Sequence, residues 1–466
     1  MTDFFRIFLD CANIFFFVYL IGYSTFLFFS VIVGATELYR NKQREHLQNK
    51  LQQSYYIPVS ILVPAYNEEI TVVDTVRSLL ALEYTLYEIV IMDDGSKDNT
   101  TGVLVDAFQM HRVDRSIRRQ LNCQEALEVY ETQNEKVPIT LVRKKNGGKA
   151  DSLNMGINCA KYPYFICMDA DSVLQSDSLD RIVRPVLENK NVVAVGGSVR
   201  PANGVVVENG KLVKYSLPKN ILACMQALEY DRSFLAARIL LDKFNGNLII
   251  SGAFGLFDKK TVIAAGGYDP STMGEDMELV VRLHEFCRSN HREYAIKYAP
   301  DAICWSQAPE ELSGLCKQRK RWQRGLYQSM SGHKQMCANP RYGVIGTVSY
   351  LYFLFYELLS PYIEVLGVVT VLLSIVMDML NVKFMLLYFV IYAAYGALLS
   401  LTAFFSRIHT LDMKLTIKDM CKAGLLCLFE ITFLRFRLAL VRATAFIGYK
   451  KNKLNWDKLD RKKLNQ

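Results

Sequence analysis

The sequence predicts an α/β domain with a parallel sheet, placed between membrane-spanning helices. Two observations indicate the membrane part: 22 uncharged residues run from Ile14 to Ala35, and a second apolar region begins near Val344. A third indicates the domain, because short β-branched strands alternate with helical segments over the intervening stretch of about 290 residues, which has no internal repeat. Such alternation is typical of a parallel sheet covered by helices.

Composition narrows the class of protein. The 466 residues are 51% hydrophobic and 22% charged, which is too apolar for a disordered chain. The net charge of +9 suits anionic lipid or a phosphorylated substrate, and we expect no nucleic-acid partner. The eleven cysteines stand singly without a CxxC motif, which is typical of reduced thiols in a reducing compartment.

The first element is a membrane span within an N-terminal segment, 1–38. A helix rises about 1.5 Å per residue, so roughly 20 apolar residues cross the hydrocarbon core. The uncharged run is too long for a signal peptide. The next segment, 39–56, is basic, and the positive-inside rule therefore predicts a cytoplasmic linker and an N-terminus outside.

The soluble domain, 57–335, opens with a predicted strand from Val59 that Pro64 stops, followed by a turn containing Tyr66 and a helix to Leu82. The next apolar run, YEIVIMDDGS, predicts a strand ending at Asp94. Ligands of parallel sheets bind beyond the carboxyl ends of the strands. We therefore expect Asn67 and Asp94 at the binding edge.

A third strand, in YFICMDADSVL, is predicted to end at Asp169 and Asp171. Alternation along a strand would turn two carboxylates that are two residues apart to the same side. Hard oxygens at that position suit a divalent cation carrying a diphosphate, Mg²⁺ or Mn²⁺. A lone DxD motif is also compatible with a solvated turn.

The turn KKNGGKADSLN precedes this strand and lacks the GxxxxGK[ST] pattern of a nucleoside-triphosphate loop. Gly147 and Gly148 permit close approach of a ligand to the backbone, Lys149 can meet a phosphate, and a helix is predicted from Ala150. A flexible surface turn is the alternative.

Two further motifs follow. The sequence GED places Glu275 and Asp276 at the start of a predicted helix, where acids also serve as plain caps. The sequence QRKRW contains Gln318, Arg321 and Trp322. A basic stretch of this kind before a membrane segment can bind lipid headgroups, or it can hold a pyrophosphate and stack on a sugar.

The C-terminal third contains the remaining membrane elements. Segment 343–406 predicts an interfacial helix to Ser360, a proline break, and a hairpin of two spans, Tyr362 to Met379 and Phe384 to Phe405. Segment 407–449 predicts re-entrant or interfacial helices, because charged residues interrupt it: Glu430, Arg435, Arg437 and Arg442. The tail, 450–466, has seven Lys/Arg against two Asp and is expected in the cytoplasm.

The ordered motifs YNE, DDGS, DAD, GED and QRKRW resemble those of membrane-bound family 2 glycosyltransferases, which include the cellulose, hyaluronan, chitin and poly-N-acetylglucosamine synthases. The resemblance runs from about Ile57 to Arg324 and implies a GT-A domain. It implies that uridine diphosphate is held by residues of the strand ends, the glycine turn and QRKRW: Tyr66, Asp94, Lys149, Asp169, Gln318 and Arg321. It further implies metal binding by Asp169 and Asp171, catalysis by Asp276, and an acceptor site at Glu275 and Trp322.

These roles agree with elementary chemistry. Displacing a nucleoside diphosphate from an anomeric carbon builds negative charge on the leaving group, which a divalent cation, Lys149 and Arg321 can stabilise. A carboxylate opposite the leaving group, here Asp276, can take the proton of the acceptor hydroxyl. A single in-line displacement inverts the configuration, so an α-linked donor gives a β-linked product.

The sequence departs from the family that it resembles in two places. The charged insert 99–145 has no assigned role, and the cyclic-dinucleotide module and FxVTxK gating loop of cellulose synthases are absent. The first hypothesis is a processive enzyme of the plasma membrane that uses UDP-N-acetylglucosamine or UDP-glucose, contacts lipid, and exports a β-linked glycan with accessory export subunits. Alternatives are transfer of one sugar to a lipid and a nucleotide-binding scaffold or pore.

Overall fold

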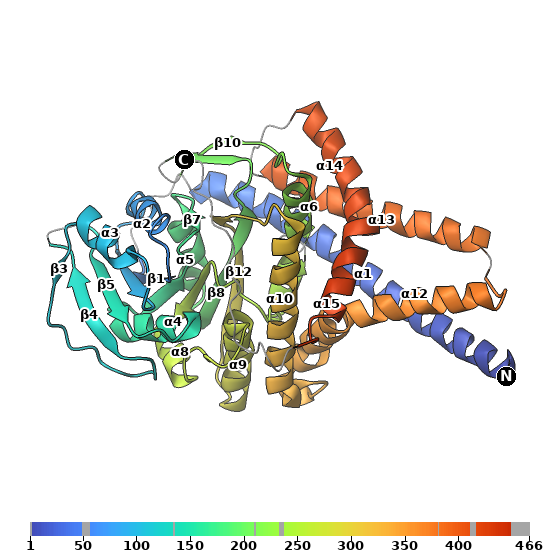
Figure 1. Cartoon of the computed structure of the whole chain (residues 1–466), viewed down its shortest axis with the longest axis horizontal. Helices are drawn as coiled ribbons and strands as arrows, with labels where there is room; N and C mark the ends of the chain where they lie inside the picture. The colour runs from blue at the N-terminus through green and yellow to red at the C-terminus, as the bar shows by residue number, and fades with distance from the viewer. Residues whose placement is uncertain are drawn as a thin grey trace.

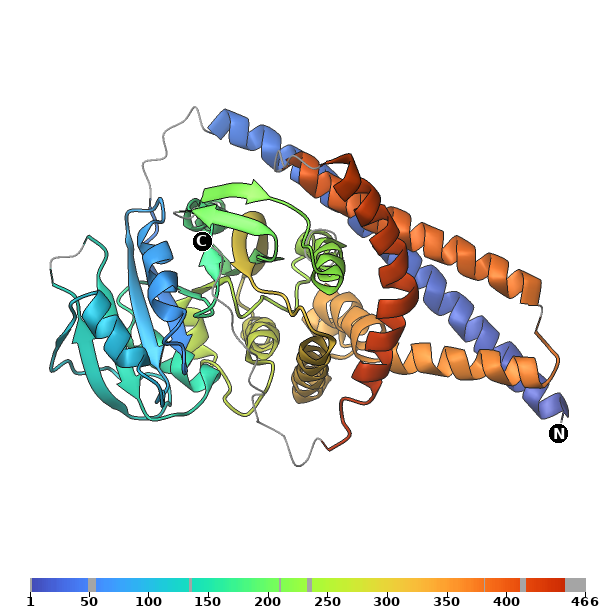
Figure 2. The ribbon, with the colours of Figure 1, turned by 45° about the horizontal axis from the view of Figure 1, so that its top comes forward.

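The computed structural model describes residues 2–48, 56–133, 136–208, 211–232, 237–380, 382–410 and 416–448. An α/β domain forms one end of the molecule, and long helices project from it at the other (Figure 1). The N-terminus lies at the far tip of the projecting helices (Figure 2).

Within the described ranges, ten strands form one sheet in the order β3-β4-β5-β2-β1-β6-β11-β8-β12-β7. Their bounds are β1 Val59–Ala65, β2 Tyr87–Asp93, β3 His111–Arg112, β4 Ala126–Glu131, β5 Ile139–Lys144, β6 Tyr164–Cys167, β7 Val173–Leu174, β8 Val192–Pro201, β11 Gly255–Asp258 and β12 Ala295–Ser306. A separate hairpin pairs β9, Val205–Glu208, with β10, Lys211–Tyr215.

The sheet is mixed, whereas the sequence predicted a parallel one. Strands β5, β2, β1 and β6 are parallel, and so are β8 and β12. Strand β11 lies antiparallel to both β6 and β8. Strand β4 is antiparallel to its neighbours β3 and β5, and the edge strand β7 is antiparallel to β12. Strand periodicity carries no information on direction. The reversal of β11 has a consequence for the site, because Gly255 at its start pairs with Cys167 at the end of β6.

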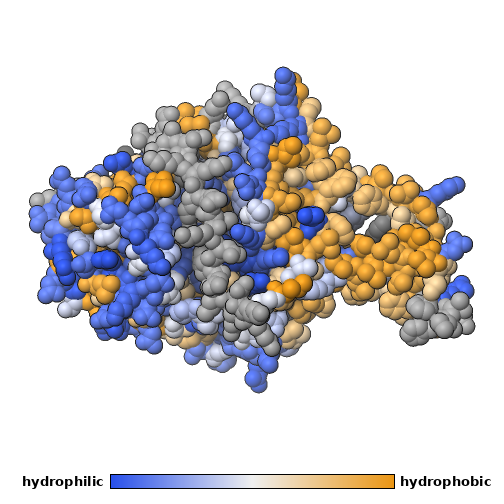
Figure 3. All heavy atoms as spheres, in the orientation of Figure 1, coloured by the Kyte–Doolittle hydropathy of each residue, from blue (hydrophilic) through white to orange (hydrophobic). Residues whose placement is uncertain are grey.

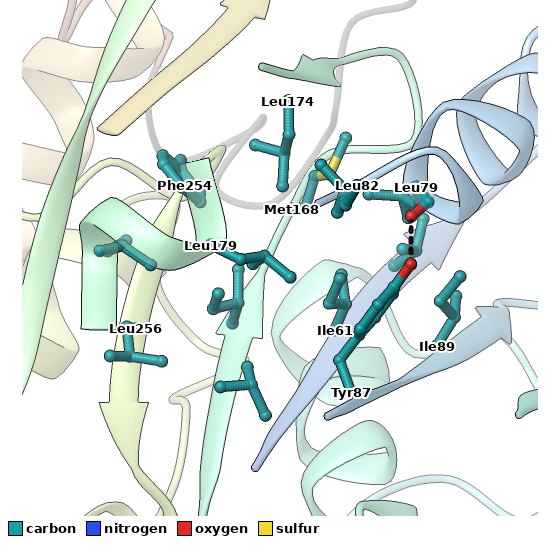
Figure 4. Close-up of a cluster of buried hydrophobic side chains, with 14 of the residues drawn as sticks. Ile61, Leu79, Leu82, Tyr87, Ile89, Met168, Leu174, Leu179, Phe254 and Leu256 are labelled. Carbon is teal, nitrogen blue, oxygen red and sulfur yellow. Dashed lines mark hydrogen bonds between the residues drawn. The ribbon is translucent and has the colours of Figure 1, made fainter. Parts of the chain in front are cut away.

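Helices cover both faces of the sheet because successive side chains of a buried strand point to opposite faces. Ile61 of β1 packs with α2 and α5, whereas its neighbour Leu62 packs with α4 and α9. Figure 4 shows the first layer, in which the Tyr87 hydroxyl donates to the Leu79 carbonyl at 2.8 Å. The domain helices are α2 Val72–Leu80, α3 Thr100–Ala107, α4 Lys149–Cys159, α5 Ser178–Glu188, α6 Ile221–Tyr230, α7 Arg238–Asp242, α8 Lys259–Ala264, α9 Glu275–Ser289 and α10 Leu312–Gly332.

The insert 99–145 supplies α3, the strands β3 to β5 and a segment that supports α4. The Asn158 side chain of α4 accepts hydrogen bonds from the amides of Gln120 and Leu121, both at 2.9 Å. The Asp151 carboxylate of α4 accepts from the Gln124 amide at 3.0 Å. The insert therefore braces the helix that follows the glycine turn.

The projecting part contains α1 Thr2–Gln48, α12 Ser360–Val376, α13 Val382–Thr410, α14 Ile417–Phe429 and α15 Arg435–Ala443. In the described residues, two helices are long and apolar enough to cross a membrane, Arg6–Gln43 and Met385–Ile408. A third is reached if the pair Ile345–Leu358 and Ser360–Val376, bent by 51°, forms one span. Figure 3 shows apolar side chains gathered over these helices and a polar surface over the domain.

Helix boundaries differ from the predicted segments at two places. Helix α1 continues as far as Gln48 through the segment expected to be a linker, and residues 49–55 of that segment lie outside the described residues. Helices α14 and α15 are joined through a single π-helical turn, Glu430–Leu434. The predicted cytoplasmic tail, 450–466, lies outside the described residues.

Candidate active site

A buried lysine supports the turn that contains Gly147 and Gly148. Lys144, the last residue of β5, lies 2.5 Å from the Asp94 carboxylate and 2.7 Å from that of Asp151. Asp94 also accepts hydrogen bonds from the amides of Gly147 and Gly148, at 2.9 and 2.8 Å. Gly148 has φ +87°, a conformation that side chains rarely adopt. The carboxylate of Asp94 thus shapes the turn that delivers Lys149.

Lys149 joins three parts of the chain at the carboxyl edge of the sheet. Its ammonium lies 2.5 Å from Asp169, 3.3 Å from the Gly252 carbonyl and 3.5 Å from Glu275. Burial favours the neutral amine, but the carboxylates of Asp169 and Glu275 outweigh it and raise the pKa of Lys149. Lys149 is therefore a fixed positive charge. The antiparallel direction of β11 is what brings Gly252, just before that strand, to this edge.

Glu275 and Asp276 occupy the first turn of α9. Asp276 is half-buried, and its carboxylate accepts from the Gly252 amide at 3.0 Å and from the Met277 amide at 2.8 Å. Glu275 is buried, and burial raises its pKa while Lys149 opposes the rise and Asp276 adds to it. The two acids therefore differ: one faces the ammonium of Lys149, and the other is oriented by backbone amides.

Asp169 and Asp171 lie in a turn, which corrects the predicted geometry. Strand β6 ends at Cys167, and the Ser172 amide donates to the Asp169 carbonyl at 3.2 Å. Strand alternation thus does not orient these carboxylates, and the turn between β6 and β7 does. Both side chains are partly exposed. Across the described ranges, no cluster of three or more His, Cys, Asp or Glu side chains could hold a metal ion, so bound oxygens of a diphosphate would have to complete a cation site.

The QRKRW motif lies inside α10, which packs against α9 and α15. Trp322 is 42% exposed, and Arg319 covers its ring at 4.6 Å while Tyr230 of α6 lies 6.5 Å away. Arg319 is itself held by a bidentate pair with Glu229 at 2.8 and 2.7 Å. The contacts with Arg319 and Tyr230 therefore fix the indole of Trp322 in place and leave part of the ring exposed.

The structure brings five of the ten predicted site residues to one region. Lys149, Asp169, Glu275 and Asp276 form one contact network with Gly252. From α10, Arg321 is near enough to lower the pKa of Glu275.

Two other predicted residues carry features suited to a ligand. The Gln318 side-chain oxygen is buried without a hydrogen-bond partner among the described residues. Tyr66 follows β1 directly, and its side chain is 41% exposed.

Sequence reasoning overlooked several supporting residues. Lys144 carried a usable signal, because it is in phase with the buried Thr140 and Val142 along β5 and therefore points inward. The Arg319–Glu229 pair carried none, because its partners are 90 residues apart. Gly252 carried no distinct signal, because it is one of several small residues in the stretch SGAFG.

Comparison with known proteins identifies the family of the chain. A sequence model of the family described as "Glycosyltransferase like family 2" matches residues 57–325. The poly-beta-1,6-N-acetyl-D-glucosamine synthase of a Staphylococcus epidermidis strain is 31% identical over 318 residues, covering 67% of this chain and 66% of that protein. The synthase of Staphylococcus aureus strain COL is 29% identical over 316 residues, with the same coverage.

Among solved structures, a mannosyltransferase from Pyrobaculum calidifontis in complex with GDP-Man and Mn²⁺ superposes with a TM-score of 0.51. Its sequence identity is 16%, and the match covers 88% of this chain and 98% of that one. This likeness supports the fold, a GT-A domain flanked by apolar helices. With the family match over more than half of its length, the chain belongs to the family 2 glycosyltransferases.

Proposed function

We propose that the chain is an inverting, processive glycosyltransferase that adds sugar from a UDP-sugar to a growing β-linked exopolysaccharide. The observation that carries the proposal is the junction at Lys149, where the DAD turn, the Gly252 loop and the GED helix meet. A positive charge beside acidic groups at one sheet edge suits a reaction that separates a diphosphate from a sugar.

Asp276 is the proposed general base. Its carboxylate is oriented by the Gly252 and Met277 amides, and it would take the proton of the acceptor hydroxyl as that oxygen attacks the anomeric carbon. Lys149, Arg321 and Gln318 would hold the diphosphate as it leaves, with Tyr66 and Asp94 at the nucleotide side. Buried Glu275 would keep Lys149 in place beside the acceptor.

Asp169 and Asp171 fit a divalent cation. Both are partly exposed carboxylates in one turn, and Mg²⁺ or Mn²⁺ is commonly bound by one or two carboxylates together with substrate phosphates. When bound, such a cation would neutralise negative charge on the diphosphate. In the ligand-free geometry the Lys149 ammonium contacts Asp169, so donor binding would rearrange this pair.

Processivity is supported by the link between the acceptor platform and the projecting helices. Gln323, next to Trp322, donates to the Leu358 carbonyl at 2.9 Å and accepts from Arg442 at 2.8 Å. Arg324 donates to the Ala445 carbonyl at 2.7 Å. A glycan stacked on Trp322 would therefore face a boundary built by the same helices that could conduct it.

Polar groups continue along these helices. Arg232 lies 3.0 Å from Glu430, and Arg435 lies 3.1 Å from Glu364 and 5.1 Å from the Tyr23 ring. Charged pairs within apolar helices are costly and usually serve a function. We propose that they border a hydrophilic path for the polymer, with the catalytic domain cytoplasmic, the protein in the plasma membrane, and accessory export subunits completing secretion.

The donor is proposed to be UDP-N-acetylglucosamine, with UDP-glucose as the alternative. The similar staphylococcal proteins are named as synthases of poly-β-1,6-N-acetylglucosamine, and the chain aligns with 66% of their length. Transfer of a single sugar to a lipid uses the same chemistry and is the competing function.

One experiment separates these functions. The full chain in purified membranes would be incubated with radiolabelled UDP-N-acetylglucosamine or UDP-glucose and a divalent cation, and the product sized before and after digestion with a hydrolase specific for β-1,6-linked N-acetylglucosamine. A digestible polymer from the first donor is expected. A product of one sugar on lipid would establish the competing function, and absence of transfer from every UDP-sugar would refute the proposal.

A further inference from the structure

Two glycines bring the GED helix and the QRKRW helix into backbone contact. Gly274 immediately precedes α9, and Gly325 lies inside α10. A Cβ atom on Gly325 would stand 2.8 Å from the Cα of Gly274 and 2.9 Å from its amide nitrogen. A Cβ atom on Gly274 would stand 2.9 Å from the Cα of Gly325. The obstructing atoms are backbone, so no side chain can rotate aside.

Glycine occupies these two positions because there is no space for a side chain, and not because the backbone conformation requires it. Neither has a positive φ. Gly325 is in the middle of a 21-residue helix, where glycine is less favourable than alanine by about 1 kcal/mol. Alanine there would stabilise an isolated α10, and the close approach of Gly274 is what opposes it.

The contact lies beside the residues proposed for catalysis. Asp276 follows Gly274 by two positions. Arg321 and Trp322 precede Gly325 by four and three positions, which places all three on one face of α10. Gln328, one turn further along that face, accepts a hydrogen bond from the Met273 amide at 2.7 Å. The contact is therefore fastened by a hydrogen bond beside the glycine pair.

We propose that Gly274 and Gly325 are positioning residues, whose contact holds the base on α9 at reacting distance from the acceptor and diphosphate groups on α10. The inference rests on the proposed roles of Asp276, Arg321 and Trp322. It adds that the rate of transfer depends on the separation of the two helices, which is small because neither glycine carries a methyl group.

The expected effect follows from the distances. Ordinary van der Waals contact begins near 3.4 Å, so a methyl group on either glycine would push the helices apart by at least about 0.5 Å. Misplacement of reacting groups by about 1 Å can cost a hundredfold in rate. Gly325→Ala should therefore lower kcat for sugar transfer by about 10- to 100-fold.

The ratio of the hydrolysis rate to the transfer rate distinguishes a displaced active-site group from a protein that has lost its fold. Hydrolysis of the UDP-sugar by water does not need an acceptor on Trp322, so Gly325→Ala should lower transfer more than hydrolysis and raise the ratio of hydrolysis to transfer at least fivefold. A variant that is merely unstable would lose both activities in proportion. The KM for the donor should change less than threefold.

The matched control is Gly332→Ala in the same helix. A Cβ atom there would meet nothing within 4 Å, so transfer, hydrolysis and apparent Tm should stay at wild-type values. A second variant, Gln328→Met, loosens the contact without adding a clash, because it removes the acceptor of the Met273 amide. It should raise the same ratio by a smaller factor, and it keeps the test decisive if Gly325→Ala does not fold.

The double variant Gly274→Ala/Gly325→Ala adds a further test, because one displacement relieves both clashes and the combined loss should be close to the larger single loss. Fully multiplicative losses would show two separate roles. The inference is overturned if Gly325→Ala folds and keeps the wild-type ratio of hydrolysis to transfer, or, where Gly325→Ala does not fold, if Gln328→Met keeps that ratio. Failure of the proposed function is distinct, since the wild-type chain itself would then transfer no sugar.

Discussion

Removal of the buried ammonium of Lys144 should destabilise the domain by several kcal/mol and loosen the donor site. The Lys144 side chain is 0% exposed, and its two carboxylate partners, Asp94 and Asp151, are 6% and 9% exposed. Lys144→Met keeps the length of the side chain and leaves both carboxylates buried without their cation. Breaking a buried ion pair from one side costs about 3–5 kcal/mol.

The adjacent residue provides a matched control. Lys145 also forms an ion pair, with Glu125 at 3.0 Å, but the two side chains are 58% and 60% exposed. Lys145→Met should therefore leave stability unchanged, because exposed pairs contribute little. The two variants remove the same charge at neighbouring positions and differ only in burial.

The assay is the thermal unfolding of the purified full chain, followed by intrinsic fluorescence, with UDP affinity measured on the same samples. With about 2–4 °C of Tm per kcal/mol for a domain of this size, Lys144→Met should lower the apparent Tm by about 10 °C. UDP should bind at least tenfold more weakly, because Asp94 then loses a partner that holds it against the amides of Gly147 and Gly148. Equal Tm shifts in the two variants would refute the reasoning.

Four further outcomes are expected. Asp276→Asn keeps the shape of the base but cannot accept a proton, so transfer should fall by about a hundredfold or more with UDP affinity near normal; a parallel loss of UDP affinity would assign Asp276 to the nucleotide site. Asp171→Asn, or a chelator with the wild-type chain, should abolish transfer and divalent-dependent UDP binding, and full activity in either case would exclude the metal assignment. Trp322→Ala should shorten the polymer more than it weakens UDP binding, whereas unaltered length and rate would leave the tryptophan a membrane-interface anchor. A single cysteine at position 464 should react with an impermeant thiol reagent only after permeabilisation of cells, since labelling of intact cells would place the tail outside.

The sequence could predict the strand ends because period-2 burial and turn residues are local signals. Strands β1 and β2 and the helix after Gly148 follow from such signals, as does the family resemblance on five ordered motifs. The direction of β11 is decided by the path of the chain through α6 and α7, which no local pattern encodes. The turn at Asp169 was mistaken for a strand end because DAD continues an apolar run.

Contacts between segments that are distant in the sequence could not be predicted either. The acids of the sequence GED are visible as a motif, whereas Gly274 is in backbone contact with a residue 51 positions later. The pair of Arg319 with Glu229 similarly depends on the packing of α6 against α10. Such partners can be identified only when the fold has placed their helices side by side.

The length of α1 determines the distance between the apolar helices and the active site. At about 1.5 Å per residue, its 47 residues extend for about 70 Å. One helix thus contacts Tyr352 and the Tyr395 hydroxyl through Phe26 and Ser24, and reaches the catalytic domain further along, where Leu38 packs with Ile239 and Tyr298.

The position of the catalytic domain along the axis of α1 and its rotation about that axis are therefore coupled. Deleting one residue between Phe26 and Leu38 would turn the docking face of α1 by about 100° relative to the other apolar helices, whereas inserting seven would nearly restore the phase and shift the domain along the helix axis by about 10 Å. A change of length that keeps the docking face of α1 in phase therefore comes in steps of about one or two helical turns, so this helix sets the separation between the catalytic domain and the apolar helices in discrete increments.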